Sequence, residues 1–324
     1  MSPGKHQRDD SLAVSPADFR SYYGRPVIKP PRWRNDIPSY LFTGGVSAGA
    51  SLLAAGADVT GRPHLRRSAR WTALAGIGLS SYFLVNDLGK PSRFLNMLRV
   101  AKPTSPMSMG TWILATFGPA IGAAAVSELS GVLPQKGLLG VVRRVLPTVG
   151  RVGGWSAAFV APHLATYTAV LLADTAVPAW HESYRPLPFV FAGSALASSA
   201  GAALLTTPVH EAGPVRRTAV LGAALDLAAG HLVENRLGLA SEAFSEPGPR
   251  RLLRAAKALT AVGAVGAVVG RRSRLLSGVS GAALLVGSAC TRFGIFQGGV
   301  VSAKDPKYTV VPQRERLTQR HAPS

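Results

Sequence analysis

The sequence predicts an all-α integral membrane protein, built as a bundle of about eight transmembrane helices. The chain has 324 residues, of which 47% are hydrophobic and only 16% are charged, whereas a soluble protein carries charge on about a quarter of its residues. The charges are also clustered, and long neutral windows separate the clusters. Because a charge at bilayer depth costs several kcal/mol, we expect a multi-pass protein of the cell (cytoplasmic) membrane.

Five windows contain no Asp, Glu, Lys or Arg at all, and each is close to the roughly 20 residues that cross a hydrocarbon core of about 30 Å. Three weaker windows follow, and two of them are interrupted by Asp226 and Arg292. A soluble Ala- and Gly-rich helical protein would carry charge on the solvated face of each helix, which the five windows lack. The eight windows are 39–57, 71–86, 103–127, 152–173, 186–209, 218–233, 255–270 and 275–303.

Aromatic and small residues support this count. All five tryptophans lie within a few residues of a window boundary, as aromatic residues of the membrane interface do. Small residues recur at four-residue spacing, which lets helices approach closely in lipid. The small-residue pairs are Gly45 with Gly49 and Gly278 with Ala282, and the tryptophans are Trp33, Trp71, Trp112, Trp155 and Trp180.

The formal net charge of +20 does not indicate nucleic-acid binding, because the arginines are spread over every loop between windows and form no single stripe. Basic loops beside apolar spans suit anionic headgroups. With eight spans both termini share one side, whose loops hold nine Lys and Arg against thirteen in the opposite loops. The short-loop rule thus favours termini outside by a small margin.

The chain divides into a polar basic tail (1–38), a transmembrane domain (39–303) and a second basic tail (304–324) that we expect to be flexible. The first tail has no apolar core or cleavage site of an export signal. Cys290 is the one cysteine. It excludes an internal disulfide, and it excludes a cysteine-ligated iron–sulfur cluster within this chain, since such a cluster needs about four thiolates.

The segment between the second and third windows is the most polar ordered stretch. This segment reads "DLGKPSRFLNMLRVAKPTSPMSMGTW" (87–112). In residues 92–100, apolar and polar side chains would lie on opposite faces of a helix, so we expect an amphipathic helix in the membrane interface. Ser105 and Pro106 then start the third transmembrane helix, serine near the N-cap and proline in the first turn. The charged residues form a loop that suits a partner subunit, with Asp87 ion-paired to Lys90 or Arg93. Its charges are Asp87, Lys90, Arg93, Arg99 and Lys102.

This segment resembles the NrfD/polysulfide reductase family of membrane subunits. The similarity extends to "YLFTGGVSAGASLLAAGAD" (40–58), "TYTAVLLADTAVPAW" (166–180), "LPFVFAGSALASSAGA" (187–202) and "TRFGIFQGG" (291–299). The resemblance implies a quinone-interacting subunit of a respiratory oxidoreductase, with menaquinone as the expected quinone and no haem or iron–sulfur cluster of its own. It also implies two partners: a ferredoxin-like four-cluster iron–sulfur subunit and a molybdopterin catalytic subunit, which determines the substrate.

Candidate site residues follow from both arguments. A quinone headgroup needs hydrogen-bond donors, a route for protons and apolar walls. In related subunits the headgroup contacts come from the start of the first helix, which aligns with Tyr40, and from a tyrosine of the fourth helix, which aligns with Tyr167. Some relatives have histidine where this chain has Tyr40, so His163, about one turn from Tyr167, is the expected proton acceptor. The remaining candidates are Ser105 and Ser108 for the quinone, Asp226 and His231 for a proton path, and Arg292 as a structural or partner residue.

Each candidate also has a structural interpretation. Ser105 can simply cap a helix, Tyr40 can be an interfacial tyrosine, and Asp226 can indicate that its helix is packed inside the bundle. Two other protein classes stay open. His163 and His231 could ligate a b-type haem through two imidazoles, which would make the chain a haem anchor. Pro119 and Pro162 inside helices are compatible with a secondary transporter, although the sequence has no clear internal repeat.

Overall fold

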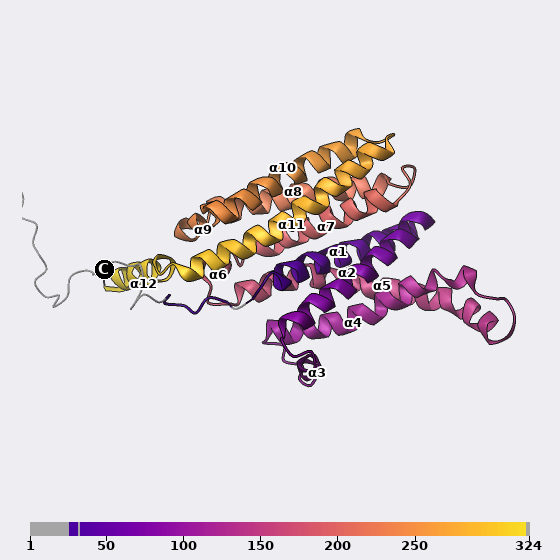
Figure 1. Ribbon diagram of the computed structural model, residues 1–324, viewed down its shortest axis with the longest axis horizontal. Helices are drawn as coiled ribbons and strands as arrows, with labels where there is room; N and C mark the ends of the chain where they lie inside the picture. Colours follow the sequence, from indigo (N-terminus) through magenta and orange to yellow (C-terminus); the bar gives the residue numbers. More distant parts are fainter. Residues whose placement is uncertain (1–25, 32, 322–324) are drawn as a thin grey trace, which may run out of the picture.

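The computed structural model describes residues 26–31 and 33–321, and within them every regular element is a helix (Figure 1). This confirms the all-α prediction. The long helices are α1 (Asp36–Val59), α2 (Pro63–Asp87), α4 (Pro106–Ser127), α5 (Gly137–Ala173), α7 (Leu187–Thr206), α8 (Gly213–Asn235), α10 (Pro247–Val269), α11 (Arg274–Lys304) and α12 (Lys307–His321). The short ones are α3 (Arg93–Met97), η1 (Ser130–Val132), α6 (Pro178–Glu182), η2 (Gly238–Ser241) and α9 (Glu242–Ser245).

Eight of the long helices form two groups of four. The first group is α1, α2, α4 and α5, and the second is α7, α8, α10 and α11 (Figure 1). Successive helices pack as antiparallel pairs, and α7 joins the groups because it contacts both α1 and α5 as well as α11. The bundle has two ends. We call the end that carries α3, α6, α9 and α12 the α6 end, and the opposite end, with loops 60–62, 128–136, 207–212 and 270–273, the arginine end.

Small residues set the contact between the groups. A side chain at Gly49 of α1 would overlap Ser199 and the backbone carbonyl of Ala195 on α7, so this predicted small-residue contact is confirmed. The second predicted pair is wrong. Gly278 of α11 has only Leu205 at 3.9 Å, and the close approach to α7 falls at Gly281 instead. The glycine that faces α7 is thus three residues after the predicted one.

Within residues 26–31 and 33–321, six helices are long and apolar enough to cross a membrane: α1, α4, α5, α7, α10 and α11. The other two members of the bundle, α2 and α8, have 25 and 23 residues. Both carry arginines in their first turns, which lower their hydropathy. α4 and α5 continue through Pro119 and Pro162, so neither is a broken helix of the kind that many transporters use.

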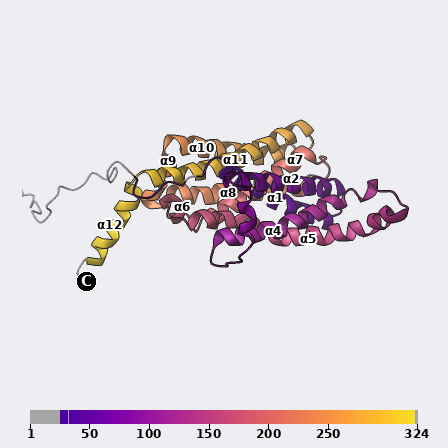
Figure 2. The ribbon, with the colours of Figure 1, turned by 60° about the horizontal axis from the view of Figure 1, so that its bottom comes forward.

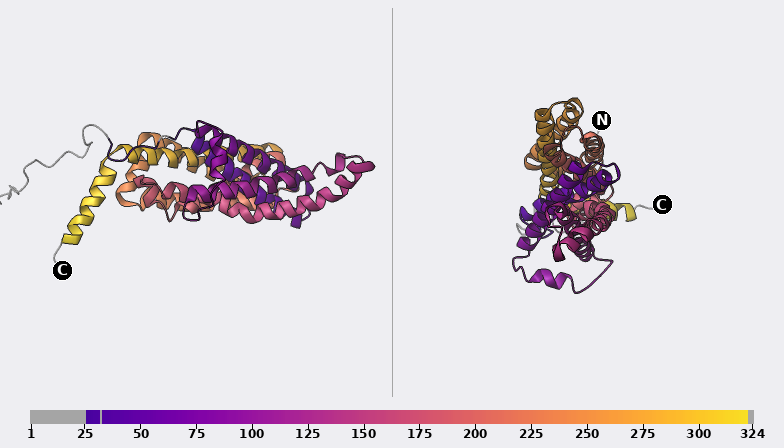
Figure 3. Two further views of the ribbon diagram at one scale, coloured as in Figure 1. Left: turned by 90° about the horizontal axis from the view of Figure 1, so that it is seen from below. Right: turned by 90° about the vertical axis from the view of Figure 1, so that its right-hand side faces the viewer.

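Two predicted loops are helical. α5 begins at Gly137, fifteen residues before the predicted window at 152, because charged residues end a membrane span without ending a helix. The C-terminal segment, expected to be a flexible tail, forms α12 from Lys307 to His321. α12 leaves the bundle at a steep angle at the α6 end (Figures 2 and 3). Between α2 and α4 the expected short helix is present as α3, and Pro106 is the first residue of α4 with Ser105 at its N-cap.

Candidate functional site

Trp180 forms the centre of the α6 end. Its side chain is fully buried, its Nε1–H donates a hydrogen bond of 2.9 Å to the carbonyl of Ile295 on α11, and its ring stacks on Trp33 at 5.8 Å between centroids. The ring occupies the space where Gly299 would otherwise carry a side chain. The prediction that all five tryptophans lie at the lipid interface is therefore wrong for Trp180, which is a core residue that anchors α6 to α11.

Tyr40 and Tyr167 belong to the same buried core. Tyr40 on α1 is 2% exposed and Tyr167 on α5 is 9% exposed, and both pack in the hydrophobic cluster that surrounds Trp180. Tyr40 is thus not an interfacial tyrosine. The Tyr167 ring lies directly against Gly110 of α4, where no Cβ atom would fit. The hydroxyl groups of Tyr40 and Tyr167 therefore place hydrogen-bond donors among apolar side chains.

His163 does not join Tyr167. It is exposed on the outer face of α5, and its ring lies 6.4 Å from that of Phe159, which is 78% exposed. Sequence spacing placed the two residues one turn apart, but the 40° angular offset of an i, i+4 pair is enough to put one side chain in the core and the other outside.

A cavity of about 260 Å³ lies at the start of α4, on the side of the 87–105 loop. Ser108 is already engaged there, since its hydroxyl donates to the carbonyl of Val100 at 2.9 Å and accepts from the amide of Lys102 at 3.0 Å. Ser105 makes no side-chain capping bond. Thr111, buried and adjacent to Gly110, also faces the cavity. The lining combines polar and apolar side chains: Asn96, Met97, Val100, Lys102, Ser105, Met107, Ser108 and Thr111.

The charges of the 87–105 loop are separate from one another. Lys90, Arg93 and Arg99 are exposed, and among the described residues the structure shows no ion pair between Asp87 and Lys90 or Arg93, so that predicted pair is wrong. Asp87 is partly buried, accepts a hydrogen bond from the backbone of Arg34 instead, and has the charge of Asp36 nearby. The exposed cations are therefore available to a partner.

A second polar centre is buried inside the second group. Arg292 on α11 is 1% exposed and Asp226 on α8 is 4% exposed. The Arg292 Nη2 donates to the carbonyl of Phe191 at 2.7 Å, and its Nε is 3.4 Å from the Ser194 hydroxyl. Its Nη1 is buried with no hydrogen-bond partner in the described part of the chain. Asp226 accepts a hydrogen bond of 3.3 Å from Thr291. Asp226 is therefore packed inside the bundle, one of the two interpretations that its position allowed.

A narrow cavity leads from Asp226 toward the α6 end. Its volume is about 20 Å³, and beyond Gly230 it ends at an ion pair of 2.6 Å between Glu234 on α8 and Lys257 on α10. His231 is exposed, bonds to Asn235 and does not line this cavity. Neither Lys257 nor its pairing with Glu234 was predicted from the sequence. The sequence indicates this pair only by an acidic and a basic residue at the same end of two predicted helices.

A match to a protein-family model shows to which family the chain belongs. The family model described as polysulphide reductase, NrfD, matches residues 29–222, which is more than half of the chain. The chain belongs to the NrfD polysulphide reductase family. It is therefore a membrane subunit of a respiratory oxidoreductase, and members of the NrfD family associate with catalytic and iron–sulfur subunits. The comparison with curated proteins gave no match.

The matched region divides the candidate residues. Tyr40, Tyr167 and the cavity at the start of α4 lie inside the NrfD match, whereas Asp226 and Arg292 lie beyond its last residue, 222. The family membership thus bears on the first polar region and leaves the second to be argued from the structure alone.

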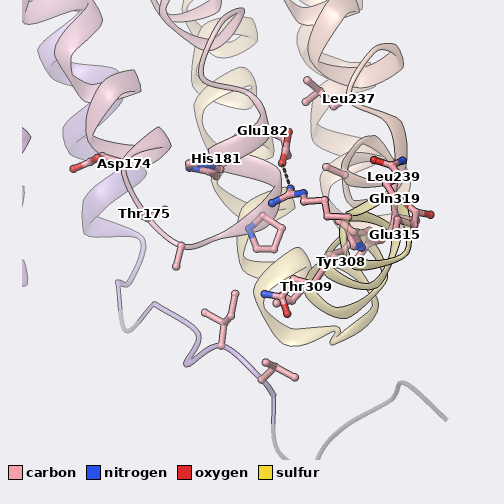
Figure 4. A pocket seen from close by; sticks show the side chains of 18 residues that line it. Asp174, Thr175, His181, Glu182, Leu237, Leu239, Tyr308, Thr309, Glu315 and Gln319 are labelled. Atoms are coloured by element: carbon pink, nitrogen blue, oxygen red, sulfur yellow. Dashed lines mark ion pairs between the residues drawn. The ribbon is translucent and has the colours of Figure 1, made fainter. Parts of the chain in front are cut away.

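A cleft of about 840 Å³ in this NrfD-family subunit lies at the α6 end between α6, η2 and α12 (Figure 4). Glu182 of α6 pairs with Arg316 of α12 at 3.6 Å, and His181 bonds through Nδ1 to the carbonyl of Ala173 at 3.0 Å. Lys307 at the start of α12 donates to Glu242 at 3.1 Å, and this hydrogen bond raises the pKa of Lys307. α12 is thus held by ion pairs at its first residue, Lys307, and at Arg316, five residues before its last residue.

Proposed function

We propose that this chain binds a membrane quinone at the α6 end and passes electrons between the quinone and an iron–sulfur partner subunit. The observation that carries the proposal is Tyr167, a buried phenol whose ring contacts Gly110 of α4; the next residue, Thr111, lines a cavity of about 260 Å³ at the start of α4. A quinone headgroup has two carbonyl groups that require donors and a tail that requires an apolar wall. This region provides both kinds of surface within the part of the chain that the NrfD family shares.

The proposed roles follow from burial. Tyr40 and Tyr167 are donors to the headgroup carbonyls, and Ser105 and Ser108 line the adjoining cavity. Tyrosine is a poor proton acceptor, because its unperturbed pKa is about 10. His163 faces outward, so we assign it no direct bond to a headgroup held by Tyr167, and it contacts only a quinone that approaches from the lipid.

Quinol oxidation releases two electrons and two protons. For the protons we propose a path through Asp226 and along the narrow cavity to the Glu234–Lys257 pair, with His231 next to its outer end. A buried carboxylic acid inside a membrane bundle is costly and is found where protons or ions move. Arg292 of α11 is the positive charge that acts on Asp226 inside the bundle.

For the bundle as a whole we propose eight spans, with α2 and α8 crossing the membrane beside the six apolar helices. α2 packs on α1 and α8 packs on α7, so one face of each is covered within the bundle, whereas Leu79 of α2 and Leu221 of α8 are 51% and 66% exposed, as side chains that face lipid are. The short α3, with exposed Leu95 (67%) and exposed arginines, lies in the interface.

The partner surface is the α6 end. Its exposed cations Lys90, Arg93 and Arg99 and the cleft beside α12 suit a polar subunit interface. The partner expected there is a ferredoxin-like iron–sulfur subunit, which connects to a molybdopterin catalytic subunit. The quinone, expected to be menaquinone, is the cofactor proposed for this chain. His163 and His231 are on α5 and α8, in different four-helix groups, and both face outward, which does not favour a haem held between them.

The test of this function is Tyr167→Phe in the assembled complex. Loss of one donor to a buried carbonyl costs on the order of 1–3 kcal/mol, which weakens quinone binding about tenfold or more. We expect quinol-dependent turnover to fall while turnover with an artificial dye that bypasses this subunit is unchanged. Tyr82→Phe is the control, since Tyr82 is 63% exposed on α2. Equal losses in both assays, or no loss in either, would remove Tyr167 from the site. A haem band in the reduced spectrum of the purified chain would favour the haem-anchor alternative.

A further inference from the structure

A groove of about 490 Å³ opens at the arginine end, between the start of α8 and the end of α10. It lies far from the quinone region, at the opposite end of the bundle. Three arginines line the part of the groove nearest the loops, and apolar side chains line the part deeper along α8 and α10. The lining residues are Gly213, Arg216, Arg217, Val220, Leu221, Val268 and Arg271.

The positive charge of this groove is not compensated. No carboxylate lines it, and none of the ion pairs among the described residues includes Arg216, Arg217 or Arg271. The acid nearest in sequence, Glu211, is directed elsewhere, because its carboxylate accepts the amide hydrogen of Leu65 on α2 at 2.8 Å. Three cations therefore gather where only an anion from outside the chain can neutralise them.

Arg216 is held in place by the backbone. Its guanidinium donates to the carbonyl of Val209 at 3.4 Å and to the carbonyl of Arg271 at 3.3 Å. Its Nε is buried and has no hydrogen-bond partner in the described part of the chain. These bonds connect Arg216 to the segment before α8 and to the α10–α11 loop, so the fold positions the Arg216 side chain in the groove.

The apolar floor starts one helical turn below the arginines. Leu221 follows Arg217 by four residues, a rise of about 6 Å along α8. Val220, Leu221 and Val268 are 41%, 66% and 42% exposed. Large apolar side chains this open at the end of a membrane helix face lipid, and here they lie directly beneath a cluster of cations.

We propose that this groove is a binding site for an anionic phospholipid. The arginines bind the phosphodiester, and one acyl chain lies along Val220, Leu221 and Val268 between α8 and α10. The N-terminus of α8, which begins at Gly213 in the groove, adds its partial positive charge. Basic pockets between transmembrane helices take up such headgroups. The site is independent of the proposed quinone chemistry.

The bound lipid also gives the chain an orientation. Anionic lipids are enriched in the cytoplasmic leaflet, so the arginine end faces the cytoplasm and the α6 end faces the opposite side. The loops between the predicted windows agree with this assignment, since they hold thirteen Lys and Arg on this side against nine on the other.

The experiment measures lipid binding to the full chain in detergent by native mass spectrometry and thermal unfolding. The additions are phosphatidylglycerol, phosphatidylcholine and inorganic phosphate. The test variant is Arg217→Gln/Arg271→Gln, which leaves the backbone contacts of Arg216 intact. The matched control is Arg250→Gln/Arg251→Gln, two arginines of α10 at the α6 end, which removes the same charge.

We expect phosphatidylglycerol alone to bind and raise the melting temperature of the wild type and of the control. The test variant should bind it on the order of tenfold more weakly, since each basic residue near the headgroup contributes to attraction. Leu221→Asn should weaken lipid binding without changing net charge, and it serves where the double variant does not fold. Equal binding of phosphatidylcholine, equal stabilisation by phosphate alone, or equal loss in the control variant would each overturn the proposal.

Discussion

Arg292 of α11 donates a hydrogen bond of 2.7 Å to the backbone carbonyl of Phe191 on α7, and its guanidinium lies 3.8 Å from the centroid of the Phe191 ring. One side chain thus contacts one residue twice, through its main chain and through its ring. Because Nη2 of Arg292 also approaches Gly45 of α1, this arginine sits where the two four-helix groups meet.

Replacing Arg292 with methionine should lower the thermal stability of the chain. The carbonyl of Phe191 loses its donor, and the carboxylate of Asp226 loses its nearby positive charge, so we expect a loss of about 1–3 kcal/mol. Thermal unfolding in detergent measures it, with Arg254→Met as the control because Arg254 is exposed on α10. Identical melting temperatures for the two variants would show that Arg292 does not stabilise the joint.

Gly110→Ala should displace Tyr167. A Cβ atom at this position overlaps the Tyr167 ring, and overpacking of this kind costs about 1–3 kcal/mol. We expect quinol-dependent turnover to fall together with the melting temperature. Gly118→Ala on the same helix is the control, since its Cβ would have no neighbour within 4 Å. If both variants behave alike, the contact between Gly110 and Tyr167 is not what positions the phenol.

The sequence predicted the helices well because absence of charge reports bilayer depth directly. It also predicted the first turn of α4 from Ser105 and Pro106, because the start of a helix depends on residues that are adjacent in sequence. It failed where the outcome depends on rotation of a helix about its axis: His163 faces outward although Tyr167 faces inward, and Gly281 replaces Gly278 at the contact with α7. Residue spacing defines neighbours on a helix but not the direction of the core. That direction is set by packing among eight helices, which no single window contains.

Long-range polar partners were equally invisible. Asp226 was singled out because it interrupts an apolar window, yet its partner Thr291 is 65 residues away. Arg70 on α2 forms an ion pair of 2.9 Å with Glu128, which follows α4. No local sequence pattern predicted this pair either. Each pairing exists because two helices are brought together by apolar faces elsewhere.

Charge reversal at Arg93 and Arg99 should release the iron–sulfur partner while the chain stays in the membrane. Both side chains are exposed at the α6 end, so glutamate there changes the docking surface and not the bundle. Co-purification of the partner measures the effect. Arg67→Glu/Arg144→Glu is the control, because these exposed arginines lie at the arginine end. A partner that survives reversal of Arg93 and Arg99 docks on another surface.

The attachment of α12 through Lys307 should weaken in the alkaline range. The hydrogen bond to Glu242 raises the pKa of Lys307 above its ordinary value of 10.5. A raised pKa means that the stabilisation is complete below the ordinary value and is lost as the pH rises through the folded-state value. We therefore expect Lys307→Met to lower stability by up to about 1 kcal/mol near neutral pH, with the difference from wild type vanishing in strong alkali.

The measurement for this pair is the difference in melting temperature between wild type and variant across the pH range. Lys304→Met is the control, since Lys304 is exposed and forms no ion pair among the described residues. A difference that persists unchanged through the alkaline range would mean that Lys307 stabilises α12 through packing of its aliphatic chain and not through its charge.

α5 has 37 residues, a length of about 55 Å at the helical rise of about 1.5 Å per residue, whereas the hydrocarbon layer is about 30 Å thick. Its first turns project beyond the rest of the bundle at the arginine end (Figures 1 and 3). The surface at this end is therefore uneven. In the first group, the first turns of α5 extend beyond the lipid headgroups. The helices of the second group end closer to the membrane, near the arginine groove. A soluble protein that docks at this end would contact the tip of α5 before it contacts the loops of the second group.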